Sequence, residues 1–344
     1  MKRLGILGFA HGHLYAYVDR WKNNPEWGIE VAAGWDHDAG RAEENCTRLE
    51  LNRTESARQM LDRPDIDGVL ICAETAYHAE LVELAAAAGK TIIVQKPLCL
   101  TLAEADRICE AVAKHGARFT LAWQMRVDPQ NLRMRQLIES GELGKIFMVR
   151  RRHTLSTHTW PGFAQLWHND PKLNRDIWAD DAAHPIDFLH WLLGFPESVT
   201  AEMGTLFDPA VPNDNGIAIF RYPGGPIAEA VCSFTSVSGE NTTEILGEKG
   251  MVIQNYGDGP SCGMPRPEGA IGLKWFLNGT PEWIDSGIPS PAGHGERIAG
   301  LAQPLADFVH GRREPIATAE EGRLSLRMVL ACYRSSQQGQ RVTP

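Results

Sequence analysis

Two aspartates and a histidine stand at residues 180–187 with spacings that suit proton transfer. Asp180 and His184 are four residues apart, and Asp187 follows three residues later. On an α-helix these spacings place all three side chains on one face. A histidine titrates near neutral pH and can act as a general acid or base, while an aspartate one turn away can hold its imidazole. We interpret Asp180 and His184 as functional, and Asp187 and His190 as structural salt-bridge or capping groups.

The same face could also hold a divalent metal, because two carboxylates and a histidine supply part of a coordination shell. An obvious further ligand pair, such as two histidines in an HxxxH pattern, does not accompany them. We therefore predict acid–base chemistry at this helix and no metal site.

A basic run at residues 150–153 precedes the helix. In a strand, alternation directs Arg150 and Arg152 to one face of the sheet. Arg151 and His153 then point to the other face. Such a run is usually solvated or paired across a subunit interface. Alternatively, one face borders a cleft and binds a polyhydroxylated or acidic substrate.

Aromatic side chains follow the basic run, namely Trp160, Trp167, His168 and Trp178. Aromatic faces stack on the apolar faces of sugar rings, but tryptophans pack as often at domain contacts, so both interpretations stay open. Arg126 is placed to approach a cleft or only a domain junction. The candidate substrate-binding residues from these segments are Arg126, His153, Trp160, Trp167 and His168.

The sequence GFAHGH at residues 8–13 could bind the phosphates of a dinucleotide. It lies between a strand-like run and a helical run, and glycines there let a pyrophosphate approach the helix N-terminus. The fit to GxGxxG is imperfect, because Ala10 and His13 occupy the second and third glycine positions and Gly12 comes one place early. The alternative is a tight strand-to-helix turn without a ligand.

Asp36 strengthens the nucleotide interpretation. It ends the second strand-like run, 28 residues after Gly8, where a carboxylate can accept hydrogen bonds from an adenosine ribose. A carboxylate there also repels a 2′-phosphate, which favours NAD over NADP. Alternatively, Asp36 caps the helix that starts at Ala39.

The N-terminal third alternates short apolar runs with longer helical ones, a pattern typical of a parallel sheet buried on both faces. We predict strands at 4–8, 28–35, 66–73, 91–97 and 117–123, and helices at 14–21, 39–49, 79–88 and 102–114. The predicted first domain, residues 1–122, is therefore a doubly wound (Rossmann) α/β domain.

The remainder, residues 123–344, is predicted to be an α+β domain with a large, mainly antiparallel sheet. Its strand-like runs are joined by turns rich in Gly and Pro. We predict helices at 132–140 and 179–193, strands at 145–154, 198–207, 216–222, 227–237 and 243–254, and a tail from Glu296 that is helical in two pieces. We expect the two domains to leave a cleft between them.

Composition narrows the class of protein. The chain has 344 residues, with 43% hydrophobic and 22% charged residues and a net charge of −9, which excludes disorder and makes nucleic acid and membrane surfaces poor partners. No apolar run approaches the length that spans a bilayer, and the first residues do not make a signal peptide. The scattered, odd set of cysteines indicates a reduced, cytoplasmic protein: Cys46, Cys72, Cys99, Cys109, Cys232, Cys262 and Cys332.

Four ordered motifs resemble the Gfo/Idh/MocA family of NAD(P)-dependent oxidoreductases, which includes inositol and sugar dehydrogenases. The family's Glu-Lys-Pro is here Gln95-Lys96-Pro97, and its turn before a histidine is here residues 72–78. GELGK at 141–145 resembles the link into the second domain, and Asp180, Ala182, His184 and Asp187 resemble its Asp-x-Gly-x-His-x-x-Asp motif. The resemblance covers almost the whole chain.

The departures from the family pattern lie around the expected nicotinamide and substrate positions. Gln95 replaces the usual Glu, Glu74 and Thr75 replace Pro-Asn, and Ala182 replaces a Gly. The glycine run before the catalytic helix is replaced by residues 174–176. The resemblance therefore implies the family's fold for this chain, but it does not imply a particular substrate.

The resemblance implies the roles of individual residues. His184 is the acid/base, Asp180 its partner, and Lys96, at the end of a strand, the third catalytic residue, with a pKa lowered by the cationic nicotinamide and partial desolvation. A surface lysine is the alternative for Lys96. The expected cofactor-binding residues are Gly8, Phe9, Ala10, His11, Gly12, His13, Asp36, Ala73, Glu74, Thr75, His78, Gln95, Lys96 and Pro97.

The function that the resemblance implies is a cytoplasmic oxidoreductase. It would transfer a hydride between NAD, with NADP possible, and a secondary alcohol or ketone of a sugar, inositol or derivative. One alternative is a glycoside-cleaving enzyme that oxidises its substrate transiently and eliminates a substituent. A second, less favoured because all three catalytic residues are present, is a non-catalytic NAD-responsive regulator. The family's open sheet implies a homo-oligomer, a dimer or a tetramer.

Overall fold

The computed structural model describes residues 1–237, 241–254, 272–289, 291 and 293–344, so Cys262 lies outside the described residues. The chain divides into two compact units. The first unit contains Met1–Gln124, Lys172–Asn174 and Ile298–Leu326, and the second contains Met125–Pro171, Arg175–Arg297 and Arg327–Pro344. Each unit has its own sheet.

The predicted division into 1–122 and 123–344 differs from these units at the C-terminal side. The first boundary is close to the predicted one, but Ile298–Leu326 belongs to the first unit. There the Leu121 N–H donates to the carbonyl oxygen of Ala317 (2.9 Å), and the Trp21 indole N–H donates to that of Ala302 (2.8 Å). Contacts between such distant segments leave no periodic pattern in the sequence.

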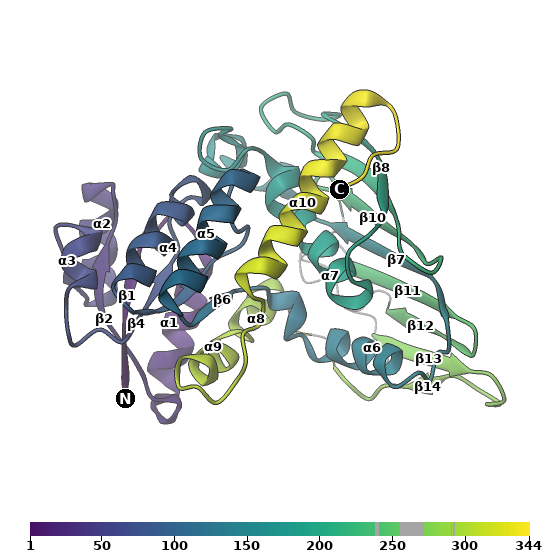
Figure 1. The fold of residues 1–344 in the computed structure, drawn as a ribbon, viewed down its shortest axis with the longest axis horizontal. Coiled ribbons are helices and arrows are strands. Elements are labelled where there is room, and N and C mark those ends of the chain that lie inside the picture. The colour runs from purple at the N-terminus through teal and green to yellow at the C-terminus, as the bar shows by residue number, and fades with distance from the viewer. Residues whose placement is uncertain (238–240, 255–271, 290, 292) are drawn as a thin grey trace. The chain divides into compact units, whose positions relative to one another are not determined.

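The first unit is built on a six-stranded parallel sheet in the order β3-β2-β1-β4-β5-β6 (Figure 1). The strands are β1 (Lys2–Leu7), β2 (Ile29–Trp35), β3 (Asn52–Arg53), β4 (Gly68–Ile71), β5 (Thr91–Val94) and β6 (Phe119–Leu121). The helices along this stretch are η1 (Pro25–Trp27), η2 (Thr75–Tyr77), α1 (His13–Asn23), α2 (Ala39–Leu49), α3 (Ala57–Leu61), α4 (His78–Ala87) and α5 (Leu102–His115). The predicted doubly wound domain is confirmed.

Burial explains why these strands are short and apolar. Every residue of β4 is buried, and β5 is buried except at its first residue, because helices cover both faces of a parallel sheet. Local signals set the helix boundaries. α5 begins with a capping box between Thr101 and Glu104 and ends at Gly116, whose φ is +58°.

The second unit contains an eight-stranded sheet in the order β14-β13-β12-β11-β7-β10-β9-β8, in which only β7 and β10 pair in parallel. The strands are β7 (Ile146–Thr154), β8 (Ser198–Gly204), β9 (Asn215–Arg221), β10 (Ile227–Ser233), β11 (Asn241–Gly247), β12 (Gly250–Gln254), β13 (Leu273–Leu277) and β14 (Ile284–Asp285). The run predicted as one strand at 243–254 is thus a hairpin. The mainly antiparallel sheet is confirmed.

The helical elements of this part of the chain precede and follow β7. They are η3 (Gln124–Arg126), α6 (Pro129–Glu139), η4 (Thr157–Thr159), η5 (Phe163–Gln165), η6 (Trp167–Asn169), the π-helical turn η7 (Trp178–Ala182) and α7 (Ala183–Leu193). α7 is buried along most of its length and packs on β7 and β10. The strands alternate buried and accessible residues, so the opposite face of the sheet is accessible.

The C-terminal tail has three helices, so the prediction of two helical pieces is wrong. They are α8 (His294–Ala299), α9 (Ala302–Val309) and α10 (Ala319–Gln338). A turn at Gly300 separates α8 from α9, and Gly311, with a φ of +75°, follows α9. None of the described helices is long and apolar enough to cross a membrane. The six cysteines in the described part of the chain form no disulfide.

Candidate functional site

Gly8 ends β1 in a conformation that a side chain would prevent. Its φ is +86°, and a β-carbon there would lie 2.3 Å from the Cα of Ala73, which follows β4. The Gly8 N–H donates to the carbonyl oxygen of Trp35 at the end of β2 (2.7 Å). The turn therefore passes closely between neighbouring strands, where the strand order reverses and doubly wound sheets bind their ligands.

The N-terminus of α1 follows this turn with open space in front of it. Gly12 precedes the helix without a side-chain cap, and no acidic residue stands in the first turn. A β-carbon on Gly12 would meet no described atom within 4 Å. His11 is buried beside the opening, with its ring edge-on to that of His13 (4.3 Å between centroids). The N-terminus of a helix suits a phosphate, because the helix dipole is positive there.

Asp36 is buried at the end of β2, and four donors hold its carboxylate. The N–H groups of Phe9 (2.7 Å) and Asp38 (2.9 Å) donate to it, and so do Nε (2.8 Å) and Nη2 (2.9 Å) of Arg41. The N-cap of α2 is Asp38, whose side chain accepts the Arg41 N–H (2.9 Å). Asp36 is therefore not the cap considered as its alternative role. The hydrogen bonds of Asp36 connect the turn that contains Gly8 to α2.

Arg41 is a site residue that the sequence analysis missed. Its Nη2 also lies 2.8 Å from Oε1 of Glu74, so it bridges two buried carboxylates. Burial alone would lower the pKa of Arg41, but the hydrogen bonds and charges of Asp36 and Glu74 outweigh this and raise that pKa above its usual value. An arginine five residues after the acidic end of β2 was the available signal.

The end of β5 brings together the residues of the Gln-Lys-Pro motif. Gln95 is buried, and its Nε2 donates to the hydroxyl of Tyr17 on α1 (3.0 Å). Burial holds the pKa of Tyr17 well above its usual value. Lys96 is also buried, and the peptide bond between Lys96 and Pro97 is cis. Lys96 is therefore not the exposed surface lysine of its alternative interpretation.

His78, the first residue of α4, links the ends of β4 and β5. Its Nε2 lies 3.1 Å from the carbonyl oxygen of Ala73, and its Nδ1 lies 3.0 Å from that of Pro97. Burial lowers the pKa of His78 below the usual histidine value, although these carbonyl groups act in the opposite direction. His78 thus supports the residues on either side of it by packing and hydrogen bonding.

A distant segment, Lys172–Asn174, also belongs to the first unit. The Ala76 N–H donates to the carbonyl oxygen of Leu173 (3.0 Å), and the Thr75 hydroxyl donates to Oδ1 of Asn174, which is fully buried. Thr75 and Asn174 are both departures from the family pattern, and here they contact each other. No local pattern in a sequence pairs positions so far apart.

In the second unit, Asp180 is buried on the π-helical turn and pairs with His168. Nδ1 of His168 lies 2.8 Å from Oδ2 of Asp180. His184, buried on α7, has its Nε2 3.6 Å from Oδ1 of Asp181. The single helix predicted at 179–193 is instead a π turn, which carries Asp180, followed by α7, which carries His184 and Asp187.

His153 and Asp187 take different places around α7. The His153 ring, on the buried face of β7, lies 5.7 Å from that of His184. Asp187 forms a bidentate ion pair with Arg126 (2.8 and 2.9 Å), and both side chains are buried. Asp187 is thus the structural salt bridge that we expected. The same pair fixes the guanidinium of Arg126 within the second unit.

Asp176 anchors the start of the π turn. Its carboxylate accepts the Ala179 N–H (3.0 Å), the Asn213 side-chain amide (2.7 Å) and the hydroxyl of Tyr333. Burial raises the pKa of Asp176 above its usual value, although these donors act in the opposite direction. The preceding Arg175 has a φ of +79°, and its guanidinium lies over the Tyr333 ring (5.3 Å). This backbone shape replaces the family's glycine run.

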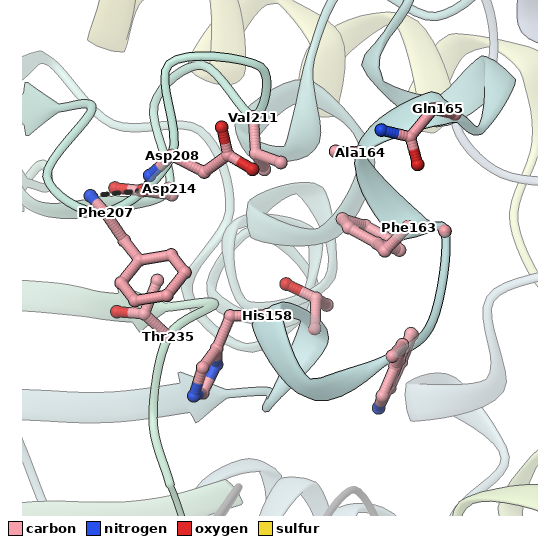
Figure 2. A pocket seen from close by; sticks show the side chains of 12 residues that line it. His158, Phe163, Ala164, Gln165, Phe207, Asp208, Val211, Asp214 and Thr235 are labelled. Atoms are coloured by element: carbon pink, nitrogen blue, oxygen red, sulfur yellow. Dashed lines mark hydrogen bonds between the residues drawn. The ribbon is translucent and has the colours of Figure 1, made fainter.

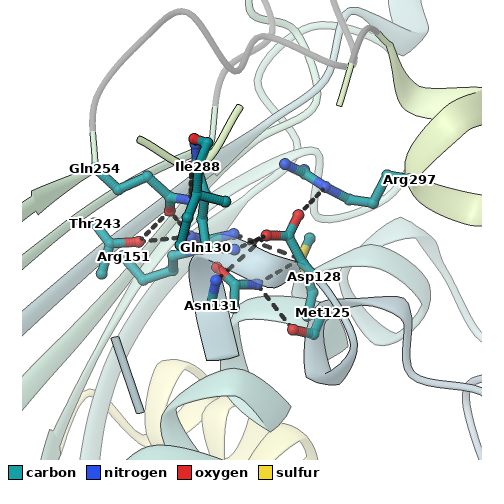
Figure 3. A network of polar contacts seen from close by, with 9 residues as sticks. All are labelled: Met125, Asp128, Gln130, Asn131, Arg151, Thr243, Gln254, Ile288 and Arg297. Carbon is teal, nitrogen blue, oxygen red and sulfur yellow. Dashed lines mark hydrogen bonds and ion pairs between the residues drawn. The ribbon is translucent and has the colours of Figure 1, made fainter. Parts of the chain in front are cut away.

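Arg151 belongs to a buried polar network rather than to an open surface (Figure 3). Its Nη1 donates to Gln254 (2.8 Å), whose Nε2 donates to Oε1 of Gln130 (2.8 Å). In the same network, Asp128 caps α6 and pairs with Arg297 (3.0 Å). Arg150, on the accessible face, instead pairs with glutamates of the neighbouring strands. The predicted alternation of the basic run therefore holds.

The aromatic residues that follow β7 differ in how deeply they are buried and in what they contact. Trp178 is fully buried against Gly216 of β9, as core packing requires. The ring of Trp167 stacks on that of His168 (4.0 Å between centroids), and the Phe163 ring lies nearly parallel to that of His168 (6.4 Å between centroids). Trp160 is 40% exposed and is one of the residues that line a pocket of about 170 Å³. Figure 2 shows this pocket from close by.

The predicted site residues form two groups. Those of the first unit follow the carboxyl ends of β1, β2, β4 and β5: Gly8, Phe9, Ala10, His11, Gly12, His13, Asp36, Ala73, Glu74, Thr75, His78, Gln95, Lys96 and Pro97. Those of the second unit surround the π turn and β7 or lie in the segment that follows β7: Arg126, His153, Trp160, Trp167, His168, Asp180 and His184.

Comparison with known proteins gives matches over both units. Residues 2–122 match the model of the oxidoreductase family with an NAD-binding Rossmann fold, and residues 131–253 match the GFO/IDH/MocA C-terminal domain. An inositol 2-dehydrogenase of Salmonella typhimurium is 31% identical over 193 residues, 55% of this chain and 52% of that protein. The match thus spans about half the length of that relative.

Two further relatives cover more of the chain. The scyllo-inositol 2-dehydrogenase (NAD(+)) of Bacillus subtilis is 27% identical over 73% of this chain and 71% of its own. A levoglucosan dehydrogenase, solved in complex with NADH and levoglucosan, has a TM-score of 0.85 at 20% identity and covers 99% of both chains. At that identity the structural likeness supports the fold alone.

Proposed function

Because the chain belongs to the GFO/IDH/MocA oxidoreductase family, we propose that it transfers a hydride between a nicotinamide cofactor and a secondary alcohol or ketone of a sugar, inositol or sugar derivative. The observation that carries this proposal is the acid–base group of the second unit, in which Asp180 and His184 are buried and His168 is partly exposed. Relatives named for inositol and levoglucosan support the class of substrate.

The first unit fits a dinucleotide. The open space at Gly12 and the N-terminus of α1 would take the pyrophosphate, and the Asp36 carboxylate would take the adenosine ribose. When bound, the nicotinamide supplies or accepts the hydride. Asp36 favours NAD, because its negative charge opposes a 2′-phosphate. NADP remains a possible cofactor, since Arg41 stands beside Asp36.

The chain's own residues would handle the proton. During oxidation, His184 would take the proton of the substrate hydroxyl, which a buried imidazole can accept. Asp180 would support the charge that His184 gains, and His168 would hold Asp180 in place through the 2.8 Å contact between Nδ1 and Oδ2. Lys96 would orient the substrate oxygen. In the reductive direction the same residues would return the proton.

The first test is reduced-nicotinamide absorbance after mixing the protein and NAD with a panel of aldoses, inositols and uronic acids. Growth of the signal with a class of substrate supports the proposal. Absence of growth despite measured NAD binding would favour a glycoside-cleaving redox cycle, which consumes no NAD overall. Absence of binding to both NAD and NADP would overturn the proposal.

Substitution of the acid–base residues tests their roles. We expect Lys96→Ala and His184→Ala to lower turnover by at least about a hundredfold, since general acid–base catalysis contributes that much, while NAD binding changes little. Cofactor fluorescence titration measures the binding. Equal losses of turnover and NAD binding would assign these residues to the cofactor site or the fold.

We also infer a cytoplasmic homo-oligomer, a dimer or a tetramer, which pairs through the accessible face of the second sheet. Ile217 and Ile219 on β9 are 46% and 43% exposed there. On the same face Arg150 pairs with Glu229 (2.6 Å) and Glu244 (3.2 Å). Such a mixture of apolar and charged side chains suits an interface. The free thiols suit a reducing compartment.

A further inference from the structure

A pocket in the second unit lies beside the acid–base group. It is bounded by η4 and η5 on one side and by the loop between β8 and β9 on the other. Its volume is about 170 Å³, comparable to cavities that hold one six-membered ring. Figure 2 shows Phe163 and Phe207 on different sides of this pocket.

Aromatic rings form much of its wall. The Trp160 ring stands edge-on to Phe163 (5.6 Å between centroids), and the His158 ring stands edge-on to Phe207 (5.2 Å). Trp160 is 40% and Phe207 62% exposed, so large apolar faces remain in contact with water. Ligand sites commonly combine such faces with a few polar groups.

The polar groups of the pocket include atoms that could bind hydroxyl groups of a ligand. Oδ1 of Asp208 accepts the Ala210 N–H (2.9 Å), while no described residue donates to its Oδ2. The Nδ1 of His158 is buried without a hydrogen-bond partner among the described residues. Asp214 instead accepts the N–H groups of Leu206 (2.8 Å) and Phe207 (2.9 Å), which fixes the loop.

The charge of the pocket selects against anions. Its described lining includes Asp208 and Asp214 but no lysine or arginine. A phosphate, sulfate or carboxylate would therefore be repelled. A neutral pyranose ring fits, because it offers an apolar face to an aromatic ring and hydroxyl protons to a carboxylate.

The pocket connects to Asp180 through two stacked rings. Phe163, which lines the pocket, lies nearly parallel to His168 (15° between planes, 6.4 Å between centroids). Nδ1 of His168 lies 2.8 Å from Oδ2 of Asp180. A ring in the pocket would therefore be a close neighbour of a ring that reacts at the acid–base group.

From this arrangement, we propose that the pocket binds a second, neutral pyranose ring of the substrate, so that the chain acts on a glycoside of two rings rather than on a free monosaccharide. This rests on the proposed function, in which the first ring reacts beside Asp180 and His184. The pocket adds binding energy and selectivity, whereas the oxidation is unchanged.

The test compares binding of one-ring and two-ring sugars to the full chain in the presence of NAD. Calorimetric titration with maltose, cellobiose and lactose, each against D-glucose and D-galactose, gives the dissociation constants. We expect at least one disaccharide to bind roughly tenfold more tightly than its component monosaccharides, as aromatic stacking on a second ring would give. If no disaccharide in the panel binds more tightly, the proposal is wrong.

Substitutions test whether the preference for a disaccharide arises in this pocket. We expect Trp160→Ala and Phe207→Ala to remove the roughly tenfold preference for the disaccharide, and Phe207→Ala to leave monosaccharide binding within about twofold. The matched control is Trp283→Ala, because Trp283 is 39% exposed but lies outside this pocket. Equal weakening of both sugar classes by Phe207→Ala, or loss of the preference in Trp283→Ala, would overturn the proposal. Unchanged melting temperatures show that the variants fold.

Turnover separates this proposal from the proposed function. A disaccharide preference that depends on Trp160, in a protein that never reduces NAD, would support the pocket and count against the dehydrogenase. If monosaccharides reduce NAD and bind as tightly as disaccharides, that result would support the dehydrogenase and count against the pocket. Release of a monosaccharide from the bound disaccharide without NADH accumulation would identify glycoside cleavage.

Discussion

At Arg175 the backbone has a left-handed conformation that usually requires glycine. Its φ is +79°, and the neighbouring Asp176 binds Tyr333 and Asn213, a second residue of positive φ (+58°). A side chain at such a φ costs on the order of 1–2 kcal/mol. The stacking of Arg175 on Tyr333 and the hydrogen bonds of Asp176 offset this cost. A left-handed backbone is therefore held at Arg175 without a glycine.

This predicts an order of stability for two substitutions. We expect Arg175→Ala to lower the free energy of unfolding by roughly 1 kcal/mol, because the cation–π contact is lost while the backbone strain remains. Arg175→Gly also loses that contact but relieves the strain, so it should be more stable than Arg175→Ala. Urea unfolding measures both. An alanine variant as stable as the glycine variant would contradict this account of Arg175.

The carboxylate of Asp36 is a second single residue from which we make a prediction, here about cofactor preference. We expect Asp36→Ser to raise the affinity for NADPH relative to NADH at least about tenfold, because it removes a carboxylate that repels the 2′-phosphate and releases Arg41 to bind it. Fluorescence titration of both reduced cofactors measures the ratio. The control is Asp38→Ser, which changes the cap of α2 but should keep the preference. An unchanged ratio in Asp36→Ser would place the discrimination elsewhere.

Among the elements, the ends of β4 and β5 are joined by the first residue of α4. His78 lies within hydrogen-bonding distance of carbonyl groups that follow both strands, and its neutral imidazole can donate to one of them. The helix start thus contacts both Ala73 and Pro97. These residues flank Glu74 and Lys96, which are buried and expected to serve the cofactor site. The shape of this edge thus depends on an uncharged, buried histidine as well as on the strands.

The burial of His78 predicts a pH dependence of stability. Its pKa in the folded protein lies below the usual 6.5, so the unfolded chain binds the proton more readily. The stability that neutral His78 contributes is fully present above pH 6.5 and is lost as the pH falls below that value. We expect His78→Gln to reduce the decline in unfolding free energy between neutral and mildly acidic pH. Identical slopes in the two proteins would show that His78 does not titrate in this way.

For the whole molecule, the sequence predicts most of the architecture but only part of the site. Alternating apolar and helical runs are local signals, and they predicted both sheets. The pairing of Asp180 with His168 depends on a π turn, and the α-helical spacing assumed for Asp180 and His184 could not reveal it. Arg41 and Asn174 gain their places through contacts across the fold, which no spacing within one element encodes.

The accessible sheet face predicts the state of assembly. We expect Ile219→Glu to convert the oligomer to a monomer in sedimentation equilibrium, because a buried, unpaired carboxylate in an apolar interface is strongly unfavourable. Leu166→Glu is the control, since Leu166 has similar exposure (45%, against 43% for Ile219) but lies outside the sheet. A monomeric wild-type protein, or an Ile219→Glu oligomer of unchanged mass, would contradict the proposed interface.

The return of Ile298–Leu326 to the first unit limits how this protein could have exchanged its parts during evolution. A gene recombined once near the codon for Gln124 would separate Trp21 from Ala302 and Leu121 from Ala317. The nucleotide-binding half would then receive a foreign partner for those contacts. Exchange of that half between paralogues therefore requires a further crossover near the codon for Ile298, or co-inheritance of the two segments.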